Sequence, residues 1–101
     1  MHNASVYRVY KELGRMNWQN AIYTCENLTC GGYSDWHLPT WDELNTMYIN
    51  KDNIGDFQSA WYWSSSYQQG VGPFGQNFTD GSQGIVEYTK TFRVRCVRKE
   101  N

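Results

Sequence analysis

The order of local signals along this chain indicates a small α+β domain with two helices and a mainly antiparallel sheet. Two segments with helical spacing of apolar residues lie in the first half, at 18–28 and 41–49. Segments rich in β-branched and aromatic residues dominate the second half, where Asp80-Gly81 is a strong hairpin signal. Helices early and strands late are typical of an α+β architecture. A chain of 101 residues corresponds to one domain, over 1–101.

The N-terminal part is expected to form a strand followed by the first helix. Val6 to Tyr10 (VYRVY) is β-rich and should pair with the C-terminal strand. Lys11 to Arg15 turns the chain through Gly14. Asn17 can cap the helix, which we place near Trp18 to Leu28.

The stretch over 31–48 (GGYSDWHLPTWDELNTMY) holds the densest local signals. Its two leading glycines accept the positive φ that ends a helix. Pro39 pushes the residue before it toward an extended conformation. Thr40 offers an N-cap hydroxyl, and Glu43 three residues later completes a capping box. A second helix that runs to about Ile49 is therefore expected.

The second half should alternate between strands and turns. Asn50 to Ser59 is polar and turn-prone, which predicts a surface loop. Ala60 to Tyr67 (AWYWSSSY) reads as a strand whose side chains alternate between two faces. Gln68 to Gly75 holds three Gly and a Pro and is predicted to be a loop. Ile85 to Tyr88 should form the returning strand, and Thr91 to Arg98 should close the sheet.

The segment GGYSDWHLPTWDEL resembles the Lcl-type C-terminal domain of bacterial collagen-like adhesins and other bacterial surface proteins. LPTWDEL is also similar to an arginine-leucine-proline-threonine element of formylglycine-generating enzymes. Both families contain variants of the C-type lectin-like fold, so the resemblance implies that fold. NWQNAIYTCENL before this segment, and YWSSSY, NFTDGS and FRVRCVR after it, occur in the expected order. The chain departs from the family at His37, commonly arginine, and at Cys30, usually an apolar or small residue.

Two of the three cysteines are expected to point into the core. Cys25 lies on the apolar face of the first helix, and Cys96 shares a face of the last strand with Phe92 and Val94. The resemblance implies a disulfide between the first helix and the last strand, which these positions match. The alternative is two buried free thiols in a reducing compartment. Cys30 would then be a free thiol or an intermolecular link.

Composition narrows the classes of partner. A net charge of -1 provides no overall attraction to nucleic acid or to an anionic membrane. A mean hydropathy of -0.75 and the absence of a long apolar run argue against membrane insertion. No signal-peptide pattern precedes the predicted fold, and we do not infer a cytoplasmic location from that.

The sequence offers few groups for catalysis or metal binding. Neither His2 nor His37 has a metal-ligand spacing, and no serine lies in an elbow sequence. The cysteine pair matches a lectin-type staple and not the copper-binding pair of formylglycine-generating enzymes. The calcium-binding triplets of C-type lectins are absent. Asp52 and Asp56 either hold a calcium ion or are solvated loop acids. We therefore expect no cofactor and no enzymatic activity.

Aromatic and amide side chains remain as contact candidates, because such groups stack on sugars and anchor protein interfaces. These ligand-binding candidates are Tyr67, Phe74, Gln76, Asn77 and Trp61. Trp63 resembles a family core position and is treated as structural. A competing surface is a basic stripe on the terminal strands, which could meet sulfated glycans or simply protect a sheet edge. Its members are Arg8, Arg93, Arg95, Arg98 and Lys99.

We therefore expect a non-catalytic, extracellular binding or adhesion module of a bacterial surface protein. Its partner would be a glycan or a protein on a host or neighbouring cell. The alternative is a structural or assembly domain at the tip of a pilus, fibre or phage particle. A domain of that kind would form a homo-oligomer without ligand.

Overall fold

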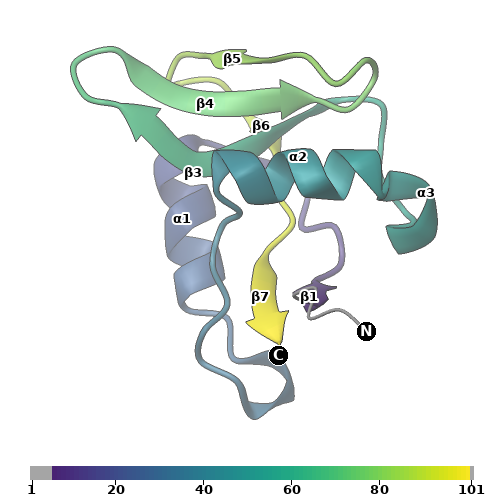
Figure 1. Ribbon diagram of the computed structural model, residues 1–101. Helices are drawn as coiled ribbons and strands as arrows, with labels where there is room; N and C mark the ends of the chain where they lie inside the picture. Colours follow the sequence, from purple (N-terminus) through teal and green to yellow (C-terminus); the bar gives the residue numbers. More distant parts are fainter. Residues whose placement is uncertain (1–5, 101) are drawn as a thin grey trace.

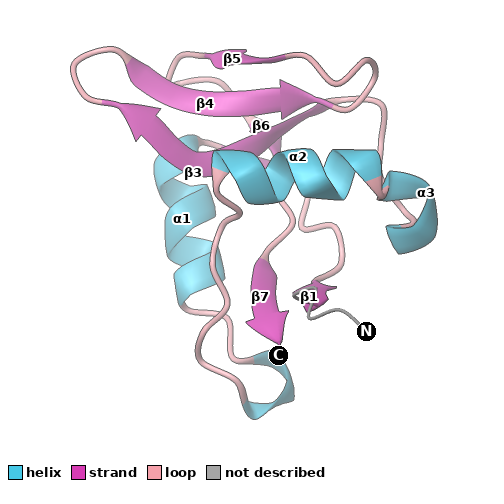
Figure 2. Ribbon diagram, viewed as in Figure 1, coloured by secondary structure: helices cyan, strands magenta, loops and turns pink. Residues whose placement is uncertain are grey.

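The computed structural model describes residues 6–100, whose helices and two mainly antiparallel sheets give the predicted α+β architecture (Figures 1 and 2). The smaller sheet pairs β1 (Val6–Val9) with β7 (Val97–Glu100), so the predicted pairing of the two terminal strands is confirmed. The larger sheet has the order β2-β6-β3-β4-β5, in which β3 and β6 run parallel. Its strands are Arg15–Met16, Phe92–Arg93, Trp61–Gln68, Gly72–Asn77 and Gln83–Ile85.

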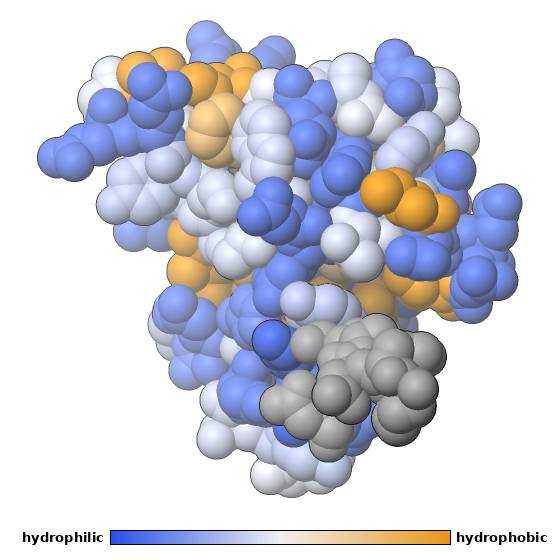
Figure 3. All heavy atoms as spheres, in the orientation of Figure 1, coloured by the Kyte–Doolittle hydropathy of each residue, from blue (hydrophilic) through white to orange (hydrophobic). Residues whose placement is uncertain are grey.

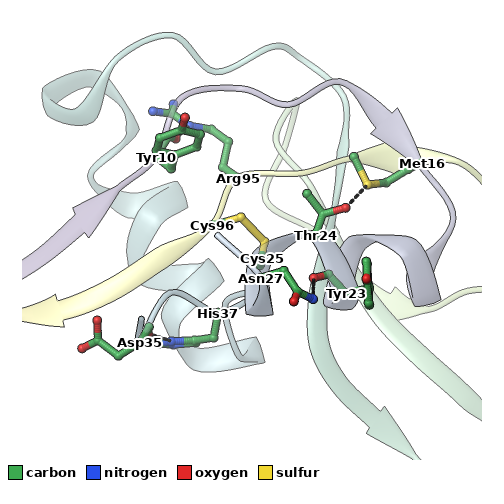
Figure 4. The surroundings of a disulfide bond; sticks show 10 residues. All are labelled: Tyr10, Met16, Tyr23, Thr24, Cys25, Asn27, Asp35, His37, Arg95 and Cys96. Atoms are coloured by element: carbon green, nitrogen blue, oxygen red, sulfur yellow. Dashed lines mark hydrogen bonds between the residues drawn. A yellow bond between two sulfur atoms is a disulfide. The ribbon is translucent and has the colours of Figure 1, made fainter. Parts of the chain in front are cut away.

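Both predicted helices are present. In α1 (Trp18–Glu26) the side chain of Asn17 accepts the N–H of Asn20 at 2.8 Å, which is the predicted cap. The helix ends two residues earlier than expected, because Asn27 closes it by donating from its side chain to the carbonyl of Tyr23 (Figure 4). The glycines that were expected to end α1 belong instead to a separate 3-10 turn, Cys30–Gly32.

The second helix, α2 (Trp41–Ile49), begins and ends where the sequence predicts. The Thr40 hydroxyl accepts the Glu43 N–H at 3.2 Å, and the Glu43 carboxylate accepts the Thr40 N–H at 2.9 Å. The predicted capping box is therefore confirmed. The prediction of a loop over residues 50–59 is wrong in part, since α3 (Lys51–Ile54) adds one more short helix.

The predicted loop over residues 68–75 is also wrong. Gln68 ends β3 and Gly72 begins β4, so the two strands form a hairpin with a tight turn over 69–71. A Cβ at Gly72 would lie 3.1 Å from the carbonyl oxygen of Val86, and one at Gly75 would lie 3.1 Å from that of Tyr62. These glycines mark close backbone approach within a sheet, which is the alternative meaning of glycine in a strand.

The C-terminal third differs from the prediction in two ways. The returning strand is β5, which ends at Ile85, and the chain then turns at 88–89. The expected continuous strand over 91–98 is divided into β6 and β7, which belong to different sheets. Between them, the carbonyls of Val94 and Cys96 accept backbone N–H groups of Leu13 and Tyr10.

The core consists of two clusters on opposite faces of β3. Trp63 lies in one cluster and Tyr62 in the other, and both are fully buried. The predicted alternation of this strand is correct, and it sends Trp63 and Tyr62 into different clusters. Helices and the terminal segments cover both faces.

The disulfide between Cys25 and Cys96 is present and joins α1 to the segment before β7 (Figure 4). Their Cα atoms are 5.4 Å apart, and both residues are fully buried. Cys30 is a free, exposed thiol. No helix within residues 6–100 combines the length and the apolar character that crossing a membrane requires.

Candidate functional site

Four exposed aromatic and aliphatic side chains and one half-buried tryptophan gather around the turn between β3 and β4. We call this surface the hairpin-tip face, and its residues are Trp18, Tyr67, Val71, Ile85 and Tyr88. Figure 3 shows hydrophobic atoms close to this end of β4 and β5. Exposed apolar groups that gather in this way are a common sign of a contact surface.

Trp18 is the fixed centre of the hairpin-tip face. It is the first residue of α1, and its indole N–H donates to the carbonyl of Ser64 in β3 at 2.8 Å. The Tyr67 ring meets it edge-on and the Tyr88 ring meets it at a tilt, each with a centroid distance of 5.7 Å. The two tyrosines are more than half exposed, so each presents a ring and a phenol to solvent from a rigid support.

A hollow of about 400 Å³ adjoins these rings. It is lined by Val71, Ile85, Val86, Glu87, Tyr88 and Thr89. Glu87 is the one charged side chain among these lining residues, so the hollow offers no cation to an anionic partner. The chemistry therefore suits a partner with apolar faces and uncharged hydroxyl or amide groups.

The structure separates Tyr67 from Phe74, which were expected to act together. Tyr67 pairs with Pro73 across the hairpin, so Phe74 points to the opposite face of the sheet. There its ring packs edge-on against Trp41 of α2 with a centroid distance of 4.1 Å. Tyr67 belongs to the hairpin-tip face, whereas Phe74 is half-buried beneath α2.

The remaining contact candidates are engaged inside the fold. Gln76 is fully buried, and its amide donates to Asn45 and to the carbonyl of Gly81, each at 3.0 Å. Asn77 holds the β4–β5 turn, where its side-chain oxygen accepts the Thr79 N–H at 2.9 Å. Trp61 is half-buried and stacks on Phe92 of β6. None of these three lies on the hairpin-tip face.

The arginines of the predicted basic stripe do not form one exposed surface. Arg95 and Arg98 are buried, with only 5 % and 8 % of their surface exposed. Arg8 lies opposite Arg98 on the smaller sheet, whereas Arg93 lies on the larger sheet. Arg8 is exposed and pairs with Glu100 at 2.7 Å. Arg93 is half-buried, so Arg8 and Lys99 are the exposed cations of this group.

Metal-binding geometry is missing from the described part of the chain, because no three His, Cys, Asp or Glu side chains cluster there. Asp52 and Asp56 both border a hollow of about 220 Å³ below α3. The ring nitrogens of His37 contact the carbonyl of Asp35 and the carboxylate of Glu43, so this side chain links parts of the fold.

Sequence reasoning missed four of the five members of the hairpin-tip face. Trp18 was placed in the first helix, Val71 in a loop, and Ile85 and Tyr88 in a strand. Trp18 is half-buried and occupies the first position of α1. The surplus of eight Tyr in this chain was the available signal, because tyrosine is enriched at contact surfaces.

Comparison with known protein families matches residues 2–98 to the Lcl C-terminal domain. The match covers nearly the whole chain and agrees with the family suggested by the segment over 31–44. A search of curated proteins gave no match.

Proposed function

This chain belongs to the Lcl C-terminal domain family, and from that premise we propose that it is a non-catalytic binding or adhesion module. Its contact surface is the hairpin-tip face, and its partner is a glycan or a protein on a cell surface. The observation that carries this proposal is the aromatic cluster in which exposed Tyr67 and Tyr88 flank an anchored Trp18.

The scaffold beneath this cluster supports a binding role. The β3–β4 hairpin rests on a core that contains Trp63 and the Cys25–Cys96 disulfide. Binding groups displayed on a rigid framework lose little conformational freedom when a partner binds. Aromatic rings that are already fixed in place before a partner binds suit a module that binds its partner without catalysing a reaction.

The same disulfide supports an extracellular location on a bacterial surface. A covalent link between α1 and the C-terminal segment persists in oxidising compartments and is rare where thiols are kept reduced. We also propose that the arrangement is a variant of the C-type lectin-like fold, supported by the paired terminal strands and the helix-to-strand disulfide.

A glycan array with and without calcium, probed with wild-type protein and a Tyr67→Ala/Tyr88→Ala variant, tests the proposal. We expect the wild-type protein to bind with or without calcium. We expect the variant to lose this binding. Binding to whole cells by the same two proteins covers the case of a protein partner. Equal binding by both proteins in both assays would contradict the proposed surface.

The alternative is an assembly domain that uses the same face to contact a second copy of itself. Val71 and Ile85 favour this alternative, because 55 % and 39 % of their surfaces are exposed and aliphatic groups suit protein contacts better than sugars. Light scattering separates the two, since an assembly domain self-associates without ligand.

A further inference from the structure

A second candidate site lies at the opposite end of the molecule, beside β1, β7 and the turn over 30–32 (Figure 1). A cavity of about 530 Å³ opens there. Two buried arginines, Arg95 and Arg98, line it together with Arg8 and Glu100. The remaining walls are largely apolar or aromatic and come from Tyr7, Val9, Tyr33, Trp36 and Ile54.

Arg95 is buried without a carboxylate partner. Its Nε donates to the carbonyl of Tyr10 at 2.8 Å, and Figure 4 shows the two residues side by side. Its Nη1 donates to the carbonyl of Gly55 at 2.6 Å. Its guanidinium also lies over the Phe57 ring, 4.4 Å from the centroid. Among residues 6–100, the ion pairs do not include Arg95, and its Nη2 donates no hydrogen bond.

An unpaired charge in this position is costly. Burial of a cation without an anion disfavours its charged form, and burial indeed lowers the pKa of Arg95 below its usual value. Carbonyl dipoles and one aromatic ring offset only part of this cost. The charges of Glu12 and Asp56 act against the lowering of this pKa, but among residues 6–100 neither carboxylate contacts the guanidinium, so Arg95 lacks a direct anionic partner.

Arg98 is in a different state. Its Nε and Nη2 donate to the two carboxylate oxygens of Asp35 at 2.7 and 3.3 Å, and its guanidinium stacks on the Tyr33 ring. Its Nη1 has no hydrogen-bond partner within the described chain, although Glu100 lies 3.6 Å away. The cavity thus holds three guanidinium groups against the single carboxylate of Glu100 on its lining.

We propose that this cavity binds a carboxylate attached to an apolar group. The carboxylate would pair with Arg95, and the apolar group would pack against the aromatic and aliphatic wall. A planar carboxylate matches the donor geometry of guanidinium groups. The source is either a free organic acid or the C-terminal residue of a peptide with an apolar side chain, since both present this chemistry.

Cys30 provides a direct test, because this exposed thiol lies on the cavity lining. Cys30 is alkylated with iodoacetamide in the presence of 3-phenylpropionate, of the uncharged 3-phenylpropionamide, or of sulfate. Mass spectrometry measures the rate of alkylation in each case. We expect 3-phenylpropionate to slow alkylation severalfold and the amide and sulfate to have little effect. Equal protection by the amide or by sulfate, or no protection by the acid, would overturn the proposal.

Two short peptides ending in Phe, one with a free C-terminus and one amidated, distinguish the two sources. Protection by the free peptide beyond that by 3-phenylpropionate identifies a peptide end as the ligand, and protection by the small acid alone identifies an organic acid. Either result supports a carboxylate site.

Two variants test the position of the site. Arg95→Gln should abolish protection, with folding checked by circular dichroism. Because Arg95 also holds two carbonyls, this variant is paired with Ile54→Glu, which places a carboxylate on the half-buried wall. A folded Ile54→Glu protein that is protected as well as the wild type would overturn the assignment. In the Tyr67→Ala/Tyr88→Ala variant, Cys30 should remain fully protected by 3-phenylpropionate. The proposal for this cavity and the proposal for the hairpin-tip face are therefore tested separately.

Discussion

The side chains of His37 and Glu43 are joined by a contact of 2.9 Å between Nε2 and Oε1. The same Glu43 oxygen accepts the Thr40 N–H that begins α2. His37 also exchanges two backbone hydrogen bonds of 2.9 Å with Val97 of β7. This side-chain pair therefore connects the capping box of α2 to the smaller sheet.

This pair predicts a pH window of maximal stability. The hydrogen bond to Glu43 raises the pKa of His37 above its usual 6.5, although burial opposes the shift. For Glu43, burial acts to raise the pKa from 4.5, but hydrogen bonds from His37 and Thr40 outweigh it and lower the pKa. The histidine contribution is complete below pH 6.5 and is lost as the pH rises through its folded-state pKa. The carboxylate contribution is present above pH 4.5 and is lost as the pH falls through its folded-state pKa.

We therefore expect His37→Gln to destabilise the protein more at about pH 5.5 than at about pH 8.5. The difference should be no more than about 1 kcal/mol, because 36 % of the His37 side chain is exposed and solvent screens the pair. Urea unfolding of both proteins at the two pH values measures it. A destabilisation that does not change with pH would show that the contact carries no charge.

The disulfide predicts a large loss of stability on reduction. Cys25 and Cys96 are 71 residues apart in sequence, and a loop of that length corresponds to about 4 kcal/mol in the chain-entropy model. Thermal unfolding with and without reductant measures the loss, and peptide mapping under non-reducing conditions identifies the bonded pair. Cys30→Ser is the control, since it should leave both results unchanged. A bond to Cys30 in the mapped peptides would contradict the assignment.

The capping box predicts a purely structural role for Thr40. Thr40→Ala should cost about 1 kcal/mol, because it leaves the Glu43 N–H without its hydroxyl partner. Thr46→Ala is a matched control in the same helix, since its hydroxyl bonds only the Asp42 carbonyl. Chemical unfolding measures both variants. Loss of partner binding by a fully stable Thr40→Ala protein would place this segment in the contact surface.

The turn between β4 and β5 predicts a contrast between two glycines. Gly81 has φ +84°, and a Cβ there would lie 2.5 Å from the Tyr48 ring. Gly81→Ala should therefore destabilise by more than about 1 kcal/mol. Gly84→Ala, at a position with open space around its Cβ, should change stability by less than about 0.5 kcal/mol. Similar unfolding midpoints for the two variants would contradict the proposed strain.

Features encoded by neighbouring residues were predictable from the sequence. The caps at Asn17 and Thr40 depend on side chains that bond the backbone three residues away, so short patterns suffice. The two core cysteines required both an apolar-face pattern and a family resemblance. Each of these features involves local chemistry or a strong covalent constraint.

Features set by strand register were not predictable in the same way. The pairing of Tyr67 with Pro73, in a segment that was expected to be a loop, decides which residues of β4 share a face with Tyr67. Strand alternation then places Phe74 on the opposite face, beneath α2, and leaves Tyr67 in solvent. Burial of Arg95 likewise depends on Tyr10 and Gly55, which are distant in sequence. Charged side chains at alternate positions of a strand are exposed only if that face of the strand meets solvent, and the face that carries Arg95 does not.

The final prediction concerns the hairpin-tip face. Tyr67→Ala/Tyr88→Ala should fold normally, because both side chains are more than half exposed and neither holds a buried hydrogen bond in the described chain. A matching Tyr67→Phe/Tyr88→Phe variant keeps the rings and removes the phenols. If the partner is a sugar bound by stacking, the Phe variant should retain most of the affinity that the Ala variant loses.

Tyr23→Ala is the matched control for these variants, because Tyr23 lies on α1 with 67 % of its surface exposed and lies outside the hairpin-tip face. Phe74→Ala is unsuitable for this purpose, since loss of its packing on Trp41 would destabilise the fold itself. Arg8→Gln tests the competing cationic surface, because Arg8 is an exposed arginine of the smaller sheet. Binding that falls steeply with salt and disappears in Arg8→Gln, but survives in Tyr67→Ala/Tyr88→Ala, would move the contact surface to the terminal strands.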